Sequence, residues 1–476
     1  MKIKIIQKFN EFAEAATMLF SIHLGSPLHL VILISLWGFL NITLALPPTM
    51  PPIFKDTPFS VIWNAPTPVC EKLEINLDTS AFNAVTTPAS VPNQFLNLFY
   101  AERIGLYPYV KPDTKEEFNG GIPQKANLTA SLLKELDDVK YYIPWFSPGL
   151  AVIDWEAWRP LWARNWSSKQ IYRELSIQNV QEKNPTLSSD ETVALAKKQF
   201  QAAARAYMEG TLKLGIEMRP NYLWGYYLFP DSYNYGWEQP GYTGECSEQE
   251  QNLNDELLWL WNSSTALFPS AYLPLGLQNN QNAAYYVRGR VQEAVRVSAL
   301  PKHSYTSPIY VYLQPLFRDQ SKIYLSEMDL MNTIGESAAL GASGAVLWGA
   351  SADYNNKESC EALSAYLPST LNPYITNVTA AAKLCSSTLC QNKGRCVRKN
   401  PQSNTYLHLN PKHFNILKSR GQYLALGMPS LSDIRKFLDD FTCQCYAGQK
   451  CSAKMPDSLP TTPVVVRVTS YETNTF

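Results

Sequence analysis

Residues 149–160 of this chain read Gly-Leu-Ala-Val-Ile-Asp-Trp-Glu-Ala-Trp-Arg-Pro, an apolar run that ends at two carboxylates. The length and composition of residues 150–153 are typical of a buried strand. Side chains two positions apart share one face of a strand, so we expect Asp154 and Glu156 to emerge together where it ends. The stretch therefore predicts two neighbouring acids at the end of a core strand.

Two carboxylates held close together are suited to acid–base chemistry. Because both cannot ionise cheaply, one stays protonated as a general acid while the other remains an anion, as glycoside hydrolysis requires. Trp155 and Trp158 flank the acids in a chain with 12 Trp and 27 Tyr, and flat aromatic rings form surfaces on which sugars stack. The alternative is that each acid pairs with an arginine such as Arg159 or caps the next helix.

Strand-like and helical segments alternate along the rest of the chain. Strands are expected over residues 59–63, 94–100, 150–153, 222–227, 309–313 and 344–348, and helices over 129–139, 193–214 and 330–341. Ser188 and Glu191 have the spacing of a capping box ahead of the second helix. Repeated strand-then-helix order at this length predicts an α/β fold whose parallel sheet closes into a barrel with the helices outside. In such barrels the chemistry lies at the C-terminal ends of the strands.

Composition and charge limit the classes of function that the chain can have. The chain has 476 residues, 45% of them hydrophobic, which is enough for one large domain and a small one. Lys and Arg number 41, as do Asp and Glu, and no basic run stands out, so nucleic acid is not an expected partner. A polyanionic substrate would have to be held by a few local cations.

The N-terminus has the features of a secretory signal. Lys2, Lys4 and Lys8 precede the apolar run 28–40, and small residues follow up to Ala45, which predicts a signal peptide over 1–45. An uncleaved signal anchor is the alternative. The C-terminus ends without a hydrophobic stretch, so no lipid-anchor signal and no stable membrane anchor are predicted.

Cysteine usage agrees with secretion. The chain has 9 Cys, an odd number that leaves one thiol over if the others form disulfides. Six of them are clustered between positions 385 and 451. Zinc ligation is the alternative for such spacing, but secretion and only 5 His disfavour it. We predict neither a metal nor another cofactor.

The stretch 149–160 resembles the signature of the hyaluronidases, glycoside hydrolase family fifty-six. Segments similar to the family also occur at 63–67, 105–109, 161–166, 223–227 and 335–342, and 406–411 is similar to the sperm-type members. This resemblance implies a distorted (β/α) TIM-like barrel over 46–383 and a small disulfide-rich EGF-like module over 384–452. The module carries a long insertion with an expected hairpin through 406–409. The Pro-rich tail 453–476 is predicted to be disordered.

The resemblance also implies a disulfide pattern. It pairs Cys70 with Cys360, Cys385 with Cys396, Cys390 with Cys443, and Cys445 with Cys451. Cys246 is left alone, because Ser232 stands where the family has a cysteine. N-glycosylation acceptors occur at Asn127, Asn165, Asn262 and Asn377.

By resemblance, the site would work through a retaining, substrate-assisted mechanism. Glu156 would be the proton donor, while Asp154 would orient the substrate amide. Tyr227 would bond the acetamido oxygen, and Trp348 would form an apolar wall. The remaining substrate-binding residues implied are Tyr107, Tyr272, Asp231, Tyr312 and Arg290, the last facing a substrate carboxylate. For Arg288, two positions away, a surface salt bridge is expected.

These inferences predict an endo-β-N-acetylhexosaminidase that cleaves hyaluronan, with chondroitin as a second glycosaminoglycan partner. The expected location is the secretory pathway, with release from the cell or storage in a secretory or acrosomal vesicle. One alternative is a hyaluronan-binding protein that has lost turnover. The other is a chitinase-like enzyme, which would not need Arg290.

Overall fold

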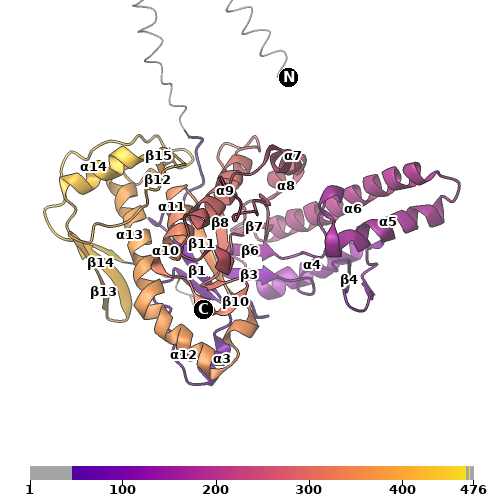
Figure 1. The fold of residues 1–476 in the computed structure, drawn as a ribbon, viewed down its shortest axis with the longest axis horizontal. Helices are drawn as coiled ribbons and strands as arrows, with labels where there is room; N and C mark the ends of the chain where they lie inside the picture. Colours follow the sequence, from indigo (N-terminus) through magenta and orange to yellow (C-terminus); the bar gives the residue numbers. More distant parts are fainter. Residues whose placement is uncertain (1–45, 468–470, 472–476) are drawn as a thin grey trace, which may run out of the picture. The chain divides into compact units, whose positions relative to one another are not determined.

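The computed structural model describes residues 46–467 and Tyr471 (Figure 1). The predicted signal over 1–45 lies outside the described residues. Two parallel sheets form the centre. One has the order β2 (Ala84–Thr86), β1 (Ser60–Asn64), β11 (Gly344–Trp348), β8 (Tyr310–Leu313), and the other the order β3 (Leu96–Phe99), β6 (Gly149–Ile153), β7 (Tyr222–Tyr226).

The segment 267–270 links the two sheets through isolated parallel bridges. Phe268 pairs with Tyr227 after β7, while Leu267 and Ser270 pair with Ile309 and Tyr312 at β8. The strands of both sheets are parallel, so their C-terminal ends point the same way. The predicted α/β class is confirmed. Side chains that directly follow these strands lie at the same edge of the sheets, the edge formed by the C-terminal strand ends.

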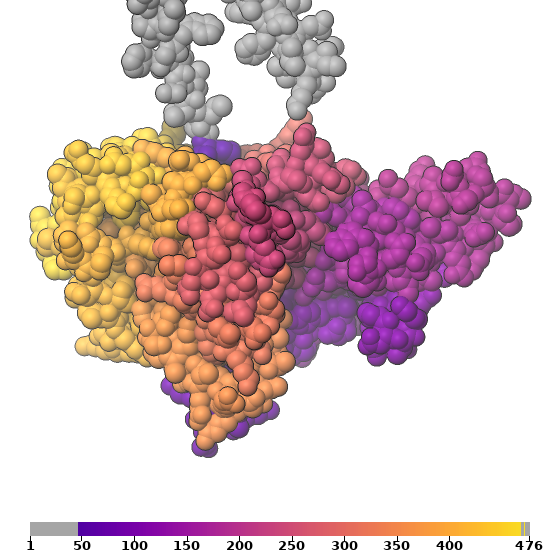
Figure 2. Space-filling model, in the orientation of Figure 1, coloured from indigo at the N-terminus to yellow at the C-terminus, as the bar shows by residue number. Residues whose placement is uncertain are grey.

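Helices surround the sheets (Figure 1). The main ones are α4 (Leu128–Tyr142), α5 (Gln170–Lys183), α6 (Ser189–Met218), α9 (Gln281–Ser298) and α13 (Asn372–Leu389). The capping box predicted from Ser188 and Glu191 is confirmed at the start of α6. The α5–α6 hairpin extends away from the sheets (Figure 1) and forms a projection on the surface (Figure 2). No helix within the described residues is long and apolar enough to cross a membrane.

The helix predicted over 330–341 is formed in three pieces. A π-helical turn (Met331–Gly335) separates α10 (Glu327–Leu330) from α11 (Glu336–Ala339). The helix ends at Ala339 and is followed by Gly341, whose φ of +91° favours glycine. A π turn places one extra residue in the helix, a change that hydrophobic periodicity does not reveal.

The C-terminal part of the chain contains β12 (Gly394–Arg398), paired antiparallel with β15 (Phe441–Cys445), and α14 (Leu431–Asp440). Its hairpin is β13 (Phe414–Ser419) with β14 (Gln422–Gly427), so the prediction of a hairpin through 406–409 is wrong. That segment forms no strand; Leu407 and Leu409 are buried, the His408 N–H donates to the Tyr406 carbonyl, and the Leu409 N–H donates to Asn377. All four implied disulfides are present.

The predicted disorder of the tail is wrong for part of it. β16 (Val464–Arg467) adds to the β13–β14 hairpin as an edge strand, and Val466 is buried. Tyr471 donates its backbone N–H to Asn83 and packs its ring against Phe95. Prolines are compatible with the approach to an edge strand, so a Pro-rich composition did not exclude this pairing.

The prediction of a surface salt bridge at Arg288 is also wrong. Arg288 is 1% exposed, and it shares the fully buried carboxylate of Glu336 with Arg398. Arg288 also donates to the backbone carbonyls of Gln402 and Ser403. The insertion of the C-terminal module covers this face of α9, a long-range contact that local sequence cannot indicate.

Candidate active site

The two acids of the opening stretch follow β6 directly. Asp154 is half-buried, and its backbone N–H donates to Phe99, the last residue of β3. One carboxylate oxygen of Asp154 is buried without a hydrogen-bond partner within the described residues. Burial and the adjacent charge of Glu156 raise the pKa of Asp154 well above its ordinary value. The pair therefore favours holding one proton between its two carboxylates.

Glu156 is the more accessible member of the pair, with a side chain that is 49% exposed. Its Oε2 lies 3.3 Å from Nη2 of Arg159. Nη1 of the same arginine donates to the Glu156 backbone carbonyl. The pairing with arginine that the sequence left open is therefore present. It coexists with the carboxylate pair and places a guanidinium directly beside Glu156.

Aromatic side chains from the neighbouring strands gather beside the acids. Tyr227 follows β7, its ring lies 5.0 Å from that of Tyr312 in β8, and its hydroxyl donates to Ser270. Tyr272 stacks between Tyr227, at 6.2 Å, and Trp348, at 5.9 Å. These four rings come from separate strands and loops of the parallel sheets, so the convergence follows from the parallel order.

Burial and the charges of the two acids raise the pKa values of two of these tyrosines. Burial raises the pKa of Tyr227, with a further contribution from the charge of Glu156. The Tyr312 hydroxyl is buried without a partner within the described residues, and burial with the charge of Asp154 raises its pKa. Both phenols thus stay protonated and can donate hydrogen bonds.

Tyr107 occupies a different place from the one expected of it. Its side chain is only 1% exposed, and its ring packs against Trp155 at 4.6 Å. The Trp158 backbone N–H donates to its hydroxyl. The structure therefore places Tyr107 behind the acids, where it supports the D-x-E segment, and not on an open surface.

Arg290 and Asp231 form a buried pair next to the site. Nη1 of Arg290 lies 3.1 Å from Oδ1 of Asp231 and donates to the Ser270 carbonyl, while Nε donates to Asn234. The guanidinium is 3% exposed and lies over the Tyr286 ring at 4.5 Å. Most of its donors are already used within the protein, although Nη2 has no partner within the described residues.

Several residues at the site were not singled out from the sequence. Tyr100, which directly follows β3, accepts a hydrogen bond from the Trp348 indole at 3.2 Å. The strand-end argument applied to residues 94–100 could have found it. Ser270 and Asn234 carry no comparable signal, because each follows an irregular segment whose position depends on tertiary contacts.

Cys246 is a free, buried thiol, as expected. Burial raises its pKa to about 12, and the Ser232 hydroxyl contacts it. Of the four glycosylation acceptors, Asn127 and Asn262 are exposed and Asn377 is half-buried. The expectation for Asn165 is wrong, because its amide is fully buried and donates to the carbonyls of Arg159 and Leu161.

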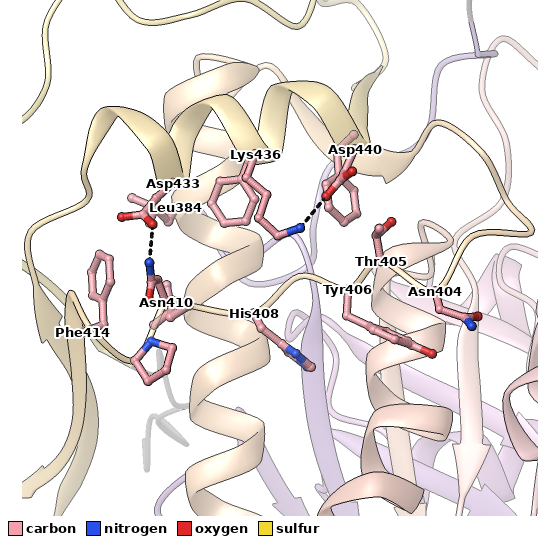
Figure 3. A pocket seen from close by; sticks show the side chains of 14 residues that line it. Leu384, Asn404, Thr405, Tyr406, His408, Asn410, Phe414, Asp433, Lys436 and Asp440 are labelled. Atoms are coloured by element: carbon pink, nitrogen blue, oxygen red, sulfur yellow. Dashed lines mark hydrogen bonds and ion pairs between the residues drawn. The ribbon is translucent and has the colours of Figure 1, made fainter. Parts of the chain in front are cut away.

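A separate cavity of about 440 Å³ lies in the C-terminal module (Figure 3). Its polar groups are largely paired, Asn410 with Asp433 and Lys436 with Asp440. His408 forms a hydrogen bond of 3.0 Å with the Tyr374 hydroxyl, and burial lowers the pKa of His408 to about 4. This cavity shares no residue with the acid site.

A carboxylate pair at the C-terminal ends of parallel strands, walled by aromatic rings, defines a glycoside hydrolase site. The sequence model of the hyaluronidase family matches residues 48–455, and the chain belongs to this family. It is 48% identical to mouse hyaluronidase-5, covering 85% of this chain and 77% of that protein. It is 46% identical to human hyaluronidase PH-20, covering 85% of this chain and 80% of that protein.

A solved structure is also similar. Bee venom hyaluronidase in complex with a hyaluronic acid tetramer matches with a TM-score of 0.59 and 31% identity. The match covers 67% of this chain and 98% of the bee protein.

Proposed function

We propose that the protein is an endo-β-N-acetylhexosaminidase that hydrolyses hyaluronan, with chondroitin as a second substrate. The observation that carries this proposal is the carboxylate pair of Asp154 and Glu156, in which the pKa of Asp154 is raised, together with the aromatic wall beside it. Family membership and the hyaluronic acid tetramer bound to the bee venom relative support the choice of substrate.

The mechanism uses the substrate's own acetamido group. Its carbonyl oxygen attacks the anomeric carbon while Glu156 donates a proton to the leaving oxygen; water activated by Glu156 then opens the cyclic intermediate. Tyr227 turns its hydroxyl hydrogen from Ser270 to the acetamido oxygen, and Trp348 packs against the acetyl methyl group. Retention of configuration follows, because the anomeric carbon is displaced twice.

The proton that Glu156 donates comes from the pair. In the free protein Asp154, whose pKa is raised, holds it, and the half-exposed Glu156 lies beside Arg159. A sugar bound over Glu156 excludes water from its carboxylate, which makes its charge costlier. The proton then passes from Asp154 to Glu156, and the Asp154 anion orients the amide and stabilises the positive charge of the intermediate.

Arg290 supports the site from beneath. Its contacts with Asp231, Asn234 and Ser270 fix the loop that follows Tyr227, and Ser270 accepts the Tyr227 hydrogen bond. Its Nη2, which is buried and forms no hydrogen bond to the residues that the structure describes, would be the atom that meets a substrate carboxylate.

We extend the proposal to the fold and the location. The parallel strands and the 267–270 bridges support a distorted (β/α) barrel, and three disulfides within 385–451 support an EGF-like module. Four disulfides are typical of a chain that folds in the secretory pathway, where Asn127, Asn262 and Asn377 meet the glycosylation machinery.

The test is product analysis after incubation of the purified protein with hyaluronan, and separately with chondroitin, from acidic to neutral pH. Even-numbered oligosaccharides with N-acetylglucosamine at the reducing end are expected from hyaluronan. Glu156→Gln keeps the shape but removes the transferable proton, so turnover should fall by at least about a hundredfold with binding kept. Wild-type binding without products would favour a binding protein instead.

A further inference from the structure

Four aromatic rings form a row that leads away from the acids. Successive centroids of Trp166, Tyr233, Tyr235 and Trp237 lie 6.2, 6.3 and 6.2 Å apart. Trp166 is 53% exposed and Tyr235 is 47% exposed. Surface aromatics of this size are usually isolated, so a continuous row of them indicates a binding surface.

The row begins next to the catalytic pair. The Tyr233 hydroxyl contacts Arg159, which in turn bonds Glu156. Lys169 lies close to the same arginine; burial and the charge of Arg159 lower the pKa of Lys169. A chain bound across Glu156 would therefore continue directly onto Tyr233.

The rings are fixed from below by charged groups. The Arg164 guanidinium lies 4.0 Å from the Tyr233 ring centre and is held by Glu250. The buried Arg290 lies 5.3 Å from the ring of Tyr235. Rings that are already immobilised lose little entropy when a ligand stacks on them.

Two cations at the ends of the row have no carboxylate partner within the described residues. Arg318, at the far end, is exposed and lies over the rings of Tyr235 and Trp237 at 5.7 and 5.5 Å. Lys169 stands at the near end. Within residues 46–467 neither side chain forms an ion pair with a carboxylate, although most other cations near the site do.

We propose that Trp166, Tyr233, Tyr235 and Trp237, with Lys169 and Arg318, form an extended binding surface for the uncleaved part of a glucuronate-containing glycan. The rings stack on sugar faces, and the two cations meet carboxylates along the chain. Because the net charge of the protein is +0, such local cations must supply the attraction. This deepens the proposed function, since it predicts a preference for long chains over short ones.

The experiment compares long hyaluronan with the shortest hyaluronan oligosaccharide that the wild-type protein cleaves. Trp166→Ala and Arg318→Gln should each raise KM for the long chain about fivefold, the effect of one modest contact, with kcat unchanged. KM for the short substrate should not change. Trp166→Phe, which keeps a ring, should restore most of the affinity. Trp145→Ala, an equally exposed tryptophan ahead of β6, and Arg435→Gln in α14 are the matched controls.

Direct binding separates this surface from catalysis. In a Glu156→Gln background, the two variants should weaken binding of long hyaluronan by the same factor as they raise KM. An uncharged N-acetylglucosamine oligomer of equal length should lose affinity with Trp166→Ala only. Unchanged binding in both variants, or equal losses on long and short chains, would overturn the extended surface. Absence of turnover in the wild-type protein would contradict the proposed function alone.

Discussion

Arg288 and Arg290 lie two positions apart on α9, and each is bound by a buried carboxylate on a different side of the helix. Arg288 binds Glu336 at 2.7 Å, on the side covered by the C-terminal module. Arg290 binds Asp231 at 3.1 Å, on the side of the acid site. One turn of helix therefore joins the C-terminal module to the acid site.

This arrangement predicts a strong effect of Glu336→Gln. The substitution leaves Arg288 and Arg398 buried without their shared charge, so the free energy of unfolding should fall by about 3–5 kcal/mol. Denaturant titration measures the loss. Glu361→Gln, at an exposed helical ion pair, is the control and should change stability by less than about 0.5 kcal/mol. A similar small change for both variants would show that the buried cluster is not structural.

A second prediction concerns the pH dependence of Asp154. Its folded pKa is raised, so the folded state keeps a proton that the unfolded state releases, and stability is lost as pH rises from the ordinary value through the raised one. Asn does not titrate. Asp154→Asn should therefore melt at a higher temperature than wild type at neutral pH, with a shrinking difference toward acidic pH, while turnover falls about a hundredfold or more.

The control for Asp154 is Asp137→Asn, on the exposed face of α4. It should leave both the melting temperature and its pH dependence unchanged. An Asp154→Asn protein that is less stable than wild type at neutral pH would contradict the buried, proton-holding role.

Glu135 gives a third prediction. It is fully buried on α4, where it contacts Thr211 and has no cation partner within the described residues, and burial raises its pKa to about 9. Folding at pH 7 then requires uptake of a proton, which costs about 3 kcal/mol. Glu135→Gln should raise the free energy of unfolding by up to about that amount at pH 7, and by little near pH 4. The exposed control Glu174→Gln should not raise the free energy of unfolding. If Glu135→Gln changed that free energy equally at both pH values, or if the control raised it, proton uptake by Glu135 would not be the cause.

The free thiol gives the fourth prediction. Ser232 and Cys246 are in contact, and Ser232 stands where the family resemblance implies a cysteine. Ser232→Cys should form a disulfide and stabilise the loop by about 3 kcal/mol in the chain-entropy model. Mass mapping of the unreduced protein and the melting temperature check it, with Ser232→Ala as the control that cannot form the bond. Two free thiols in Ser232→Cys would show that the side chains do not meet.

The sequence by itself identified the acid pair and the strand that carries it. Residues 150–153 are apolar and short, and strand periodicity places Asp154 and Glu156 together, so this prediction needed only local geometry. The capping box at Ser188 followed from spacing in the same way. The disulfides and the aromatic residues Tyr227 and Trp348 came from family resemblance, which carries long-range information that composition lacks.

Only the tertiary structure decided which polar groups are buried. Arg288, Asn165 and Tyr107 all have residue types and surroundings compatible with a surface, yet long-range packing encloses each of them. The edge strand β16 and the row from Trp166 to Trp237 likewise join segments far apart in the chain. Local sequence fixes backbone periodicity, but burial and pairing between distant segments depend on how the whole chain packs, because desolvation is a property of the three-dimensional surroundings of a group.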